Sequence, residues 1–131
     1  MSAEEEVRRA AEALVTAFGG GDLDAYFAAF ADDATFLFHT TDRLLRSTDE
    51  YRREWARWVA EDGFRVLGCE TSDTVVQMFG DTAVLTHRVR TTVAANDGQS
   101  ELHERETIVF ARQEDGRWLA VHEHLSPAPG A

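Results

Sequence analysis

Lysine is absent from this chain, cysteine occurs once, proline occurs twice, and there is no long apolar run. Without lysine, all 13 basic residues are arginine, which with many Ala, Gly and Asp indicates a GC-rich genome rather than a function. The single cysteine, Cys69, excludes an internal disulfide framework. A membrane-spanning helix needs roughly 20 consecutive apolar residues, and residues 1–6 are acidic where a signal peptide would be basic. We therefore expect a cytoplasmic protein.

Acidic residues outnumber basic ones, and the formal net charge is −11. At long range this charge repels both the phosphate backbone of nucleic acid and an anionic membrane surface, so neither is an expected partner. A length of 131 residues suits one domain, which we place at residues 1–127, followed by a short flexible tail at residues 128–131.

The first third of the chain has the apolar spacing of helices. Capping boxes at residues 2–5 and 47–50 predict the starts of two helices, which end at the glycines 19–21 and near Gly63, and Asp22 caps a shorter helix between them. Apolar residues at helical spacing predict a buried face on each helix: Val7, Ala11, Leu14 and Phe18, then Leu23, Tyr26, Phe27 and Phe30, then Tyr51, Trp55, Trp58 and Val59.

After the third helix the apolar period changes to two, which is the spacing of strands. Turn signals FGD, ANDG and EDG separate four such segments, at residues 64–78, 82–93, 99–112 and 117–126. The stretch ATFLFH, residues 34–39, predicts one short earlier strand.

This order of elements predicts the α+β class. We expect a cone-shaped fold in which three N-terminal helices pack on a curved, mainly antiparallel β-sheet. Because the helices cannot cover the whole concave face of the sheet, a pocket should remain between the two layers.

Two stretches resemble the SnoaL-like branch of the nuclear transport factor 2-like superfamily: GGGDLDAYFAAFADDATF and DGRWLAVHEHLSP, residues 19–36 and 115–127. The resemblance runs from about Glu5 to Pro127. It implies the cone-shaped fold and a homodimer formed through the sheet. The superfamily uses this scaffold for ketosteroid isomerases, polyketide cyclases, dehydratases and the non-enzymatic association domain of a calcium/calmodulin-dependent kinase, so the resemblance leaves the activity open.

The ketosteroid isomerase machinery does not carry over residue by residue. Phe38 stands where that family has its Asp general base, and Leu14 stands where it has its oxyanion-hole Tyr. Without the base and the phenolic donor, ketosteroid isomerisation is not expected. The pocket Arg of the kinase association domain aligns with Leu125, so an anion preference should not carry over either.

Histidines are the candidate catalytic groups on the strands. Alternation predicts that His87 faces inward. In the next strand His103 and Arg105 share one face while Glu104 and Glu106 share the other, and both faces end in apolar residues, so which face is inward stays open.

In the last strand, strict alternation places His122 and His124 on the same face as Trp118 and Ala120, and His39 ends the first strand. Histidines at i and i+2 can chelate a metal, but nothing in the spacing supplies a third ligand, so we predict no metal site. One interpretation is structural, with an imidazole bonded to a helix or a carboxylate. The other is functional, with a pocket-facing imidazole of pKa near 6.5 that shuttles protons.

Two functions remain possible. The first is a pocket protein acting as a cofactor-free isomerase, cyclase or dehydratase, with acid–base groups His39, His87 and His124. Its ligand would be a small apolar or aromatic molecule with a polar group, and the candidate binding residues are Tyr26, Phe30, Phe38, Trp55, Trp58, His103, Arg105 and His122. The second is a ligand-binding or association module without catalysis. Aromatic residues at helical spacing more often form a plain hydrophobic core than a pocket wall.

Overall fold

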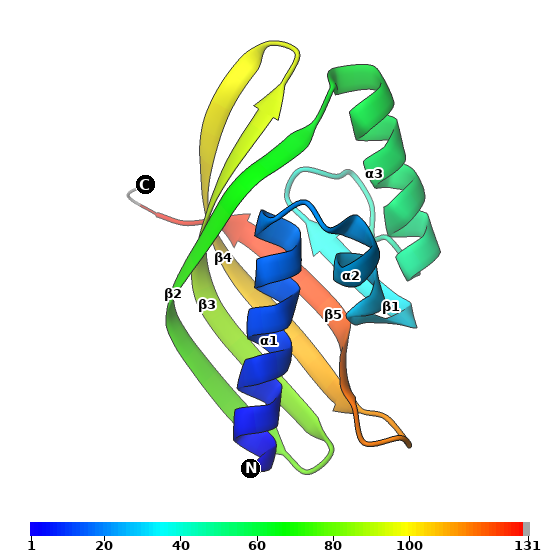
Figure 1. Ribbon diagram of the computed structural model, residues 1–131, viewed down its shortest axis with the longest axis vertical. Coiled ribbons are helices and arrows are strands. Elements are labelled where there is room, and N and C mark those ends of the chain that lie inside the picture. The colour runs from blue at the N-terminus through cyan, green and yellow to red at the C-terminus, as the bar shows by residue number, and fades with distance from the viewer. Residues whose placement is uncertain (130–131) are drawn as a thin grey trace.

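The computed structural model describes residues 1–129 as a layer of helices on one curved sheet (Figure 1). The helices are α1 (Ala3–Gly19), α2 (Leu23–Ala28) and α3 (Thr48–Asp62). The strands are β1 (Phe30–Phe38), β2 (Arg65–Phe79), β3 (Thr82–Ala95), β4 (Gly98–Arg112) and β5 (Trp118–Pro127). The α+β class and the cone-shaped architecture are confirmed. Of the predicted tail, residues 130 and 131 lie outside the described part.

The helices begin and end where the capping residues predict. At the start of α1, the Ser2 side chain accepts a hydrogen bond from the Glu5 amide, and the Glu5 carboxylate accepts one from the Ser2 amide. At the start of α3, the Ser47 side chain accepts a hydrogen bond from the Glu50 amide. Gly63 ends α3 in the left-handed conformation, with φ 64°. One predicted core residue is wrong, because Val59 is 45% exposed. Within the described chain, no helix is both long and apolar enough to cross a membrane.

The sheet has the strand order β1-β5-β4-β3-β2. The three predicted hairpins join β2 to β5 in sequence, and every pairing among these four strands is antiparallel. The earlier strand begins at Phe30 rather than Ala34, ends at Phe38, and pairs in parallel with β5. His39 therefore directly follows β1 instead of ending it.

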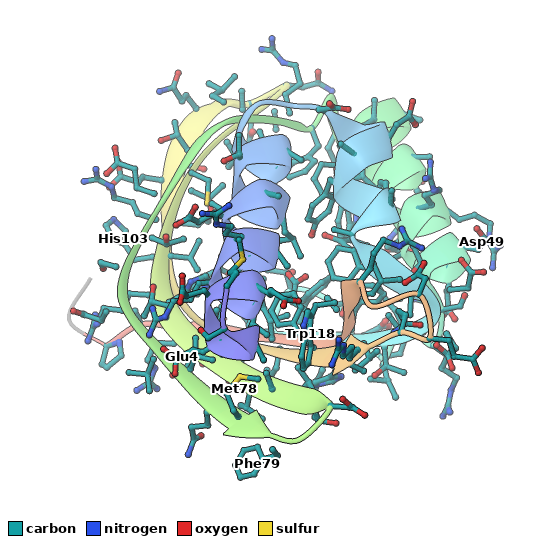
Figure 2. The ribbon with its side chains drawn as sticks, turned by 60° about the horizontal axis from the view of Figure 1, so that its bottom comes forward. Glu4, Asp49, Met78, Phe79, His103 and Trp118 are labelled. Carbon is teal, nitrogen blue, oxygen red and sulfur yellow. The ribbon has the colours of Figure 1, made fainter. Side chains whose placement is uncertain are left out.

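Irregular pairing bends the sheet into a half-cone. The register shifts between Val66 and Gly68, again between Ser72 and Val75, and once more in β5 opposite Val109. Such bulges increase the local twist and bend a strand. The sheet consequently curls around α1, which packs against its concave face (Figure 2).

Candidate functional site

A cavity of about 620 Å³ lies between the helices and the concave face of the sheet. This is the size range of small-molecule sites. Its wall combines aromatic side chains from the helices with aliphatic and acidic side chains from the strands: Leu14, Val15, Phe18, Tyr26, Phe38, Thr40, Tyr51, Trp55, Trp58, Glu61, Asp62, Phe64, Cys69, Val89, Thr91, Val93, Ala95, Asn96, Asp97, Leu102, Glu104, Glu106, Glu123 and Leu125. The predicted pocket between the layers is therefore present as a cavity.

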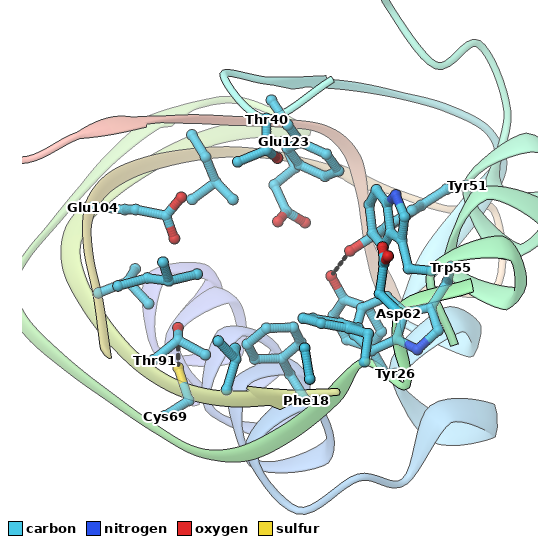
Figure 3. Close-up of a pocket in the computed structure, with 18 of the residues that line it drawn as sticks. Phe18, Tyr26, Thr40, Tyr51, Trp55, Asp62, Cys69, Thr91, Glu104 and Glu123 are labelled. Atoms are coloured by element: carbon cyan, nitrogen blue, oxygen red, sulfur yellow. Dashed lines mark hydrogen bonds between the residues drawn. The ribbon is translucent and has the colours of Figure 1, made fainter. Parts of the chain in front are cut away.

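Two tyrosines carry hydroxyl groups to this cavity from the helical side. The Tyr26 and Tyr51 hydroxyl oxygens are 2.9 Å apart and share a hydrogen bond (Figure 3). Burial, and secondly the nearby Glu123 carboxylate, raise the pKa of both phenols well above the usual value. Both phenols therefore stay protonated. One of the two hydroxyl protons forms the hydrogen bond between them, and the other can be donated to a further acceptor.

Three glutamates reach the cavity from the sheet side. Glu104 and Glu106 alternate in phase with the buried Ile108 and Phe110 on β4, so all four point toward the helices. The sequence did not decide which face of this strand points inward, and the structure shows that it is the face with Glu104 and Glu106. Glu123 on β5 is the third, and its carboxylate is directed toward the tyrosine pair in Figure 3.

A bulge in β5 brings Glu123 inside. Val109 pairs with His122 while the next residue, Phe110, pairs with Ala120, so Val121 is an extra residue in β5. The alternation changes phase at this point. Ala120 and Glu123 are therefore both buried on the concave side.

Each of the two β4 carboxylates is bonded to a histidine. The His39 Nε2 lies 2.6 Å from Glu104 Oε2, and the His87 Nε2 lies 2.5 Å from Glu106 Oε1. His87 and Glu106 are directly opposite each other in the β3–β4 register. These bonds orient the carboxylates, and the 31% exposure of the His39 side chain connects Glu104 to solvent.

Glu123 has a different environment from the other two. Its residue is 3% exposed, and its Oε2 has no hydrogen-bond partner. Burial raises the pKa of this carboxyl well above the usual value, the neighbouring Glu106 and Glu104 raise it further, and the Tyr26 hydroxyl opposes the rise. This environment favours the protonated form of Glu123 over the carboxylate.

The predicted aromatic residues are largely brought together. Tyr26, Phe38, Trp55 and Trp58 line the cavity. Phe30 instead lies in the hydrophobic core, packed edge-on against Tyr26 and Phe36.

The predicted histidines are divided between two places, the inner side of the sheet and its outer face. His39 and His87 stand behind Glu104 and Glu106, with His87 facing inward as predicted and lining a smaller hollow of about 380 Å³ between α1 and β2. His124 is exposed on the outer face of the sheet.

The predicted inward face of β5 is wrong beyond Ala120. Because of the bulge at Val121, His122 and His124 point to the outer face, where His122 Nδ1 lies 2.7 Å from the Thr35 hydroxyl on the neighbouring strand. Burial lowers the pKa of His122, with His124 as the second cause.

His103 and Arg105 are also exposed on the outer face, as Figure 2 shows for His103. The structure therefore places these two predicted binding residues away from the cavity. Within residues 1–129, no group of three or more His, Cys, Asp or Glu side chains is arranged to hold a metal ion.

Sequence reasoning missed the three glutamates as site residues. For Glu104 and Glu106 the signal was available, since they continue the apolar period of Ile108 and Phe110 and one of them pairs across the sheet with the inward His87. For Glu123 the alternation itself was misleading, because the bulge is invisible in the residue pattern.

Known structures share this fold across nearly the whole chain. An NTF2-like protein from Rhodospirillum rubrum matches with TM-score 0.79 and 23% identity, covering 93% of this chain and 98% of that one. A ketosteroid isomerase-like protein from Erwinia carotovora matches with TM-score 0.78 and 20% identity, covering 95% and 96%. The CaMKII hub of S. rosetta matches with TM-score 0.75 and 25% identity, covering 95% of each chain.

Sequence comparison is more specific about the family. No curated protein matches the chain significantly. Residues 7–130, however, match the SnoaL-like domain family over almost the full length. The chain therefore belongs to the SnoaL-like domain family and has the nuclear transport factor 2-like fold.

Proposed function

We propose that the protein is a cofactor-free acid–base enzyme that moves a proton next to a carbonyl group of a small, largely apolar substrate. The observation that carries this proposal is the pairing of unlike groups in one cavity. Glutamates bonded to histidines face two phenol hydroxyl groups that keep their protons. Neighbouring titratable groups in environments that favour different protonation states are typical of acid–base sites.

Glu104 is the proposed base. Its carboxylate takes a proton from the carbon beside the carbonyl, and the electron pair of the broken C–H bond moves to the carbonyl oxygen. His39, which is hydrogen-bonded to Glu104, orients this base and passes the proton that Glu104 has taken from the substrate on to solvent.

The tyrosine pair is the proposed donor to the developing enolate. The Tyr26–Tyr51 hydrogen bond uses one of the two hydroxyl protons, and both residues belong to a wall that is largely lined by aromatic and aliphatic side chains. Hydrogen bonds to an oxyanion in such a place stabilise it more than they would in water. From the enolate, reprotonation at another carbon gives an isomerase, attack on a second carbonyl gives a cyclase, and loss of a β-hydroxyl gives a dehydratase.

Exchange of a carbon-bound proton for deuterium tests the step shared by all three reactions. A panel of cyclic ketones and β-diketones is incubated with the protein in D2O, binding is measured by saturation-transfer NMR, and exchange is measured as loss of the α-proton signal. We expect at least one bound compound to exchange faster with protein than without it. Glu104→Gln should slow this exchange about 10²- to 10⁴-fold.

Glu114→Gln is the matched control, because Glu114 is an exposed carboxylate in the β4–β5 turn, outside the cavity wall. It should leave the exchange rate unchanged. Exchange that survives Glu104→Gln removes Glu104 as the base, and a panel in which no compound exchanges refutes the enzymatic proposal.

A non-catalytic ligand-binding or association module is the second candidate. The hub fold of S. rosetta favours it, as do the exposed Arg88, Arg90 and Arg105 on the outer face of the sheet, where a homodimer would form. Compounds that bind the cavity without proton exchange would support this function over the enzymatic one.

A further inference from the structure

The charge of the cavity wall is one-sided. Among the described residues that line it there are six acidic residues and no Arg or His: Glu61, Asp62, Asp97, Glu104, Glu106 and Glu123. The arginines of the sheet, Arg88, Arg90 and Arg105, point to the opposite side. A ligand with a negative charge would therefore enter against the field of the wall, whereas a cation would be attracted.

The acidic groups occur at two depths. Glu61, Asp62 and Asp97 are exposed at the end of α3 and in the β3–β4 hairpin, around the opening. Glu104, Glu106 and Glu123 are buried at the inner end. Of the three outer groups, Glu61 is paired with Arg57. The outer carboxylates attract a cation to the opening, and the inner ones are placed to contact it.

A second observation, independent of the charge of the wall, also points to a ligand, and it concerns Glu123. Its Oε2 is buried, lacks a hydrogen-bond partner and belongs to a side chain directed into the cavity (Figure 3). An unpartnered buried acceptor is costly, and a hydrogen bond from a charged donor is among the strongest ways to satisfy it. The groups that face Glu123 are Tyr26 from α2, Tyr51 from α3, and Glu104 and Glu106 from β4, with none that carries a positive charge.

The remaining wall suits the apolar body of such a ligand. Trp55, Trp58 and Phe64 form a mutually packed aromatic group, with ring centroids 5.2 to 6.1 Å apart. Aromatic faces attract an organic cation and also bury its hydrocarbon part. A metal ion is less well matched, because no set of three or more ligating side chains is arranged for one within residues 1–129.

We propose that the cavity selects small molecules that carry a protonated amine on an apolar or aromatic body, with the ammonium group against Glu123 and the body against Trp55 and Trp58. This inference rests on the proposed binding site and names the class of its substrate. Burial and the neighbouring carboxyl groups favour the protonated form of Glu123 in the empty cavity, whereas an ammonium group bound there favours the carboxylate. Binding should therefore release a proton to solvent and strengthen as the pH rises.

Four probes of similar size separate charge from shape. They are 2-phenylethylamine, its neutral counterpart 2-phenylethanol, the anion 3-phenylpropanoate and the trimethylated amine, which keeps the charge and lacks an N–H donor. Titration calorimetry at neutral pH measures their affinities, and two buffers of different ionisation enthalpy measure the protons released. We expect the amine to bind about tenfold or more tightly than the alcohol, and the anion to bind most weakly.

Glu123→Gln is the decisive variant. It should remove the preference for the amine and the proton release, while the affinity for 2-phenylethanol stays within about twofold because the shape of the cavity is kept. Glu114→Gln, outside the cavity, should change neither. Equal affinity of the amine and the alcohol, a preference for the anion, full amine affinity in Glu123→Gln, or no amine binding at millimolar concentration overturns the inference.

Failure of this inference is separable from failure of the proposed function. The probes have no proton next to a ketone, so they report binding alone. Deuterium exchange on the ketone panel with no amine preference would leave the acid–base function standing. An amine preference without exchange would leave a binding protein for organic cations.

Discussion

Replacing Glu123 by Gln should stabilise the protein increasingly as the pH rises. A carboxyl group whose pKa is raised by folding holds its proton more tightly in the folded than in the unfolded chain. Its contribution to stability is therefore fully present below the pKa of an unfolded Glu, about 4.3, and is lost as the pH rises toward the raised folded value. Gln has the shape of the protonated carboxyl and no proton to lose.

The size of the effect follows from the linkage relation. While Glu123 stays protonated in the folded protein and ionised in the unfolded one, each pH unit removes about 1.4 kcal/mol of wild-type stability. Between about pH 5 and about pH 7 the difference between the two proteins should therefore grow by at most about 2.7 kcal/mol. For 131 residues at about 2.1 cal/mol/K per residue, this corresponds to a change of about 10 °C in the difference between their melting temperatures.

Urea unfolding across this pH range measures the difference directly. Comparison of the variant with the wild type cancels the other titrating groups, and Glu114→Gln shows how much any lost surface carboxylate contributes. A difference between Glu123→Gln and wild type that stays constant with pH would refute the reasoning. Glu123 would then be ionised in the folded protein, and the proposed release of its proton on amine binding could not be retained.

Two further predictions concern the glycines that follow α1 and α3 and the cysteine in the cavity wall. Gly21→Ala should cost about 1 to 2 kcal/mol of unfolding free energy, since φ is 75° there. Gly63→Ala should cost more, because φ is 64° and the added methyl would also overlap the Asn96 side chain; equal losses in urea unfolding would contradict this. Burial raises the pKa of the Cys69 thiol to about 11. At about pH 8 an aromatic disulfide reagent should therefore react roughly 200-fold more slowly with the folded protein than with the urea-unfolded chain, and equal rates would show an accessible thiolate.

Most of the fold could be predicted from local signals in the sequence. Capping at Ser2 and Ser47 and the turn residues between strands act over a few neighbours, so their consequences can be read from the chain directly. The start of β1 at Phe30 was missed because its pairing partner, β5, lies at the other end of the chain. Nothing within residues 30–33 distinguishes a strand from the end of a helix.

The site was harder to predict because it depends on phase along a strand. One extra residue, Val121, exchanged the faces of everything after it and moved Glu123 inside while His124 went outside. Charged residues such as Glu104 and Glu106 are ordinarily assigned to solvent, and only their pairing with His39 and His87 explains their burial. Those contacts join segments that are far apart in the sequence, so the residue pattern of one strand cannot predict them.

The parallel pairing of β1 with β5 also has a consequence for synthesis of the chain. Thr35 meets His122 only after 87 further residues have been made, and β5 contributes Glu123 and Leu125 to the cavity wall. Until β5 has emerged from the ribosome, β1 and β4 each present an unpaired edge on the side where β5 later pairs. The nascent chain is therefore exposed to aggregation until β5 is available, and the cavity closes only when β5 pairs with β1 and β4.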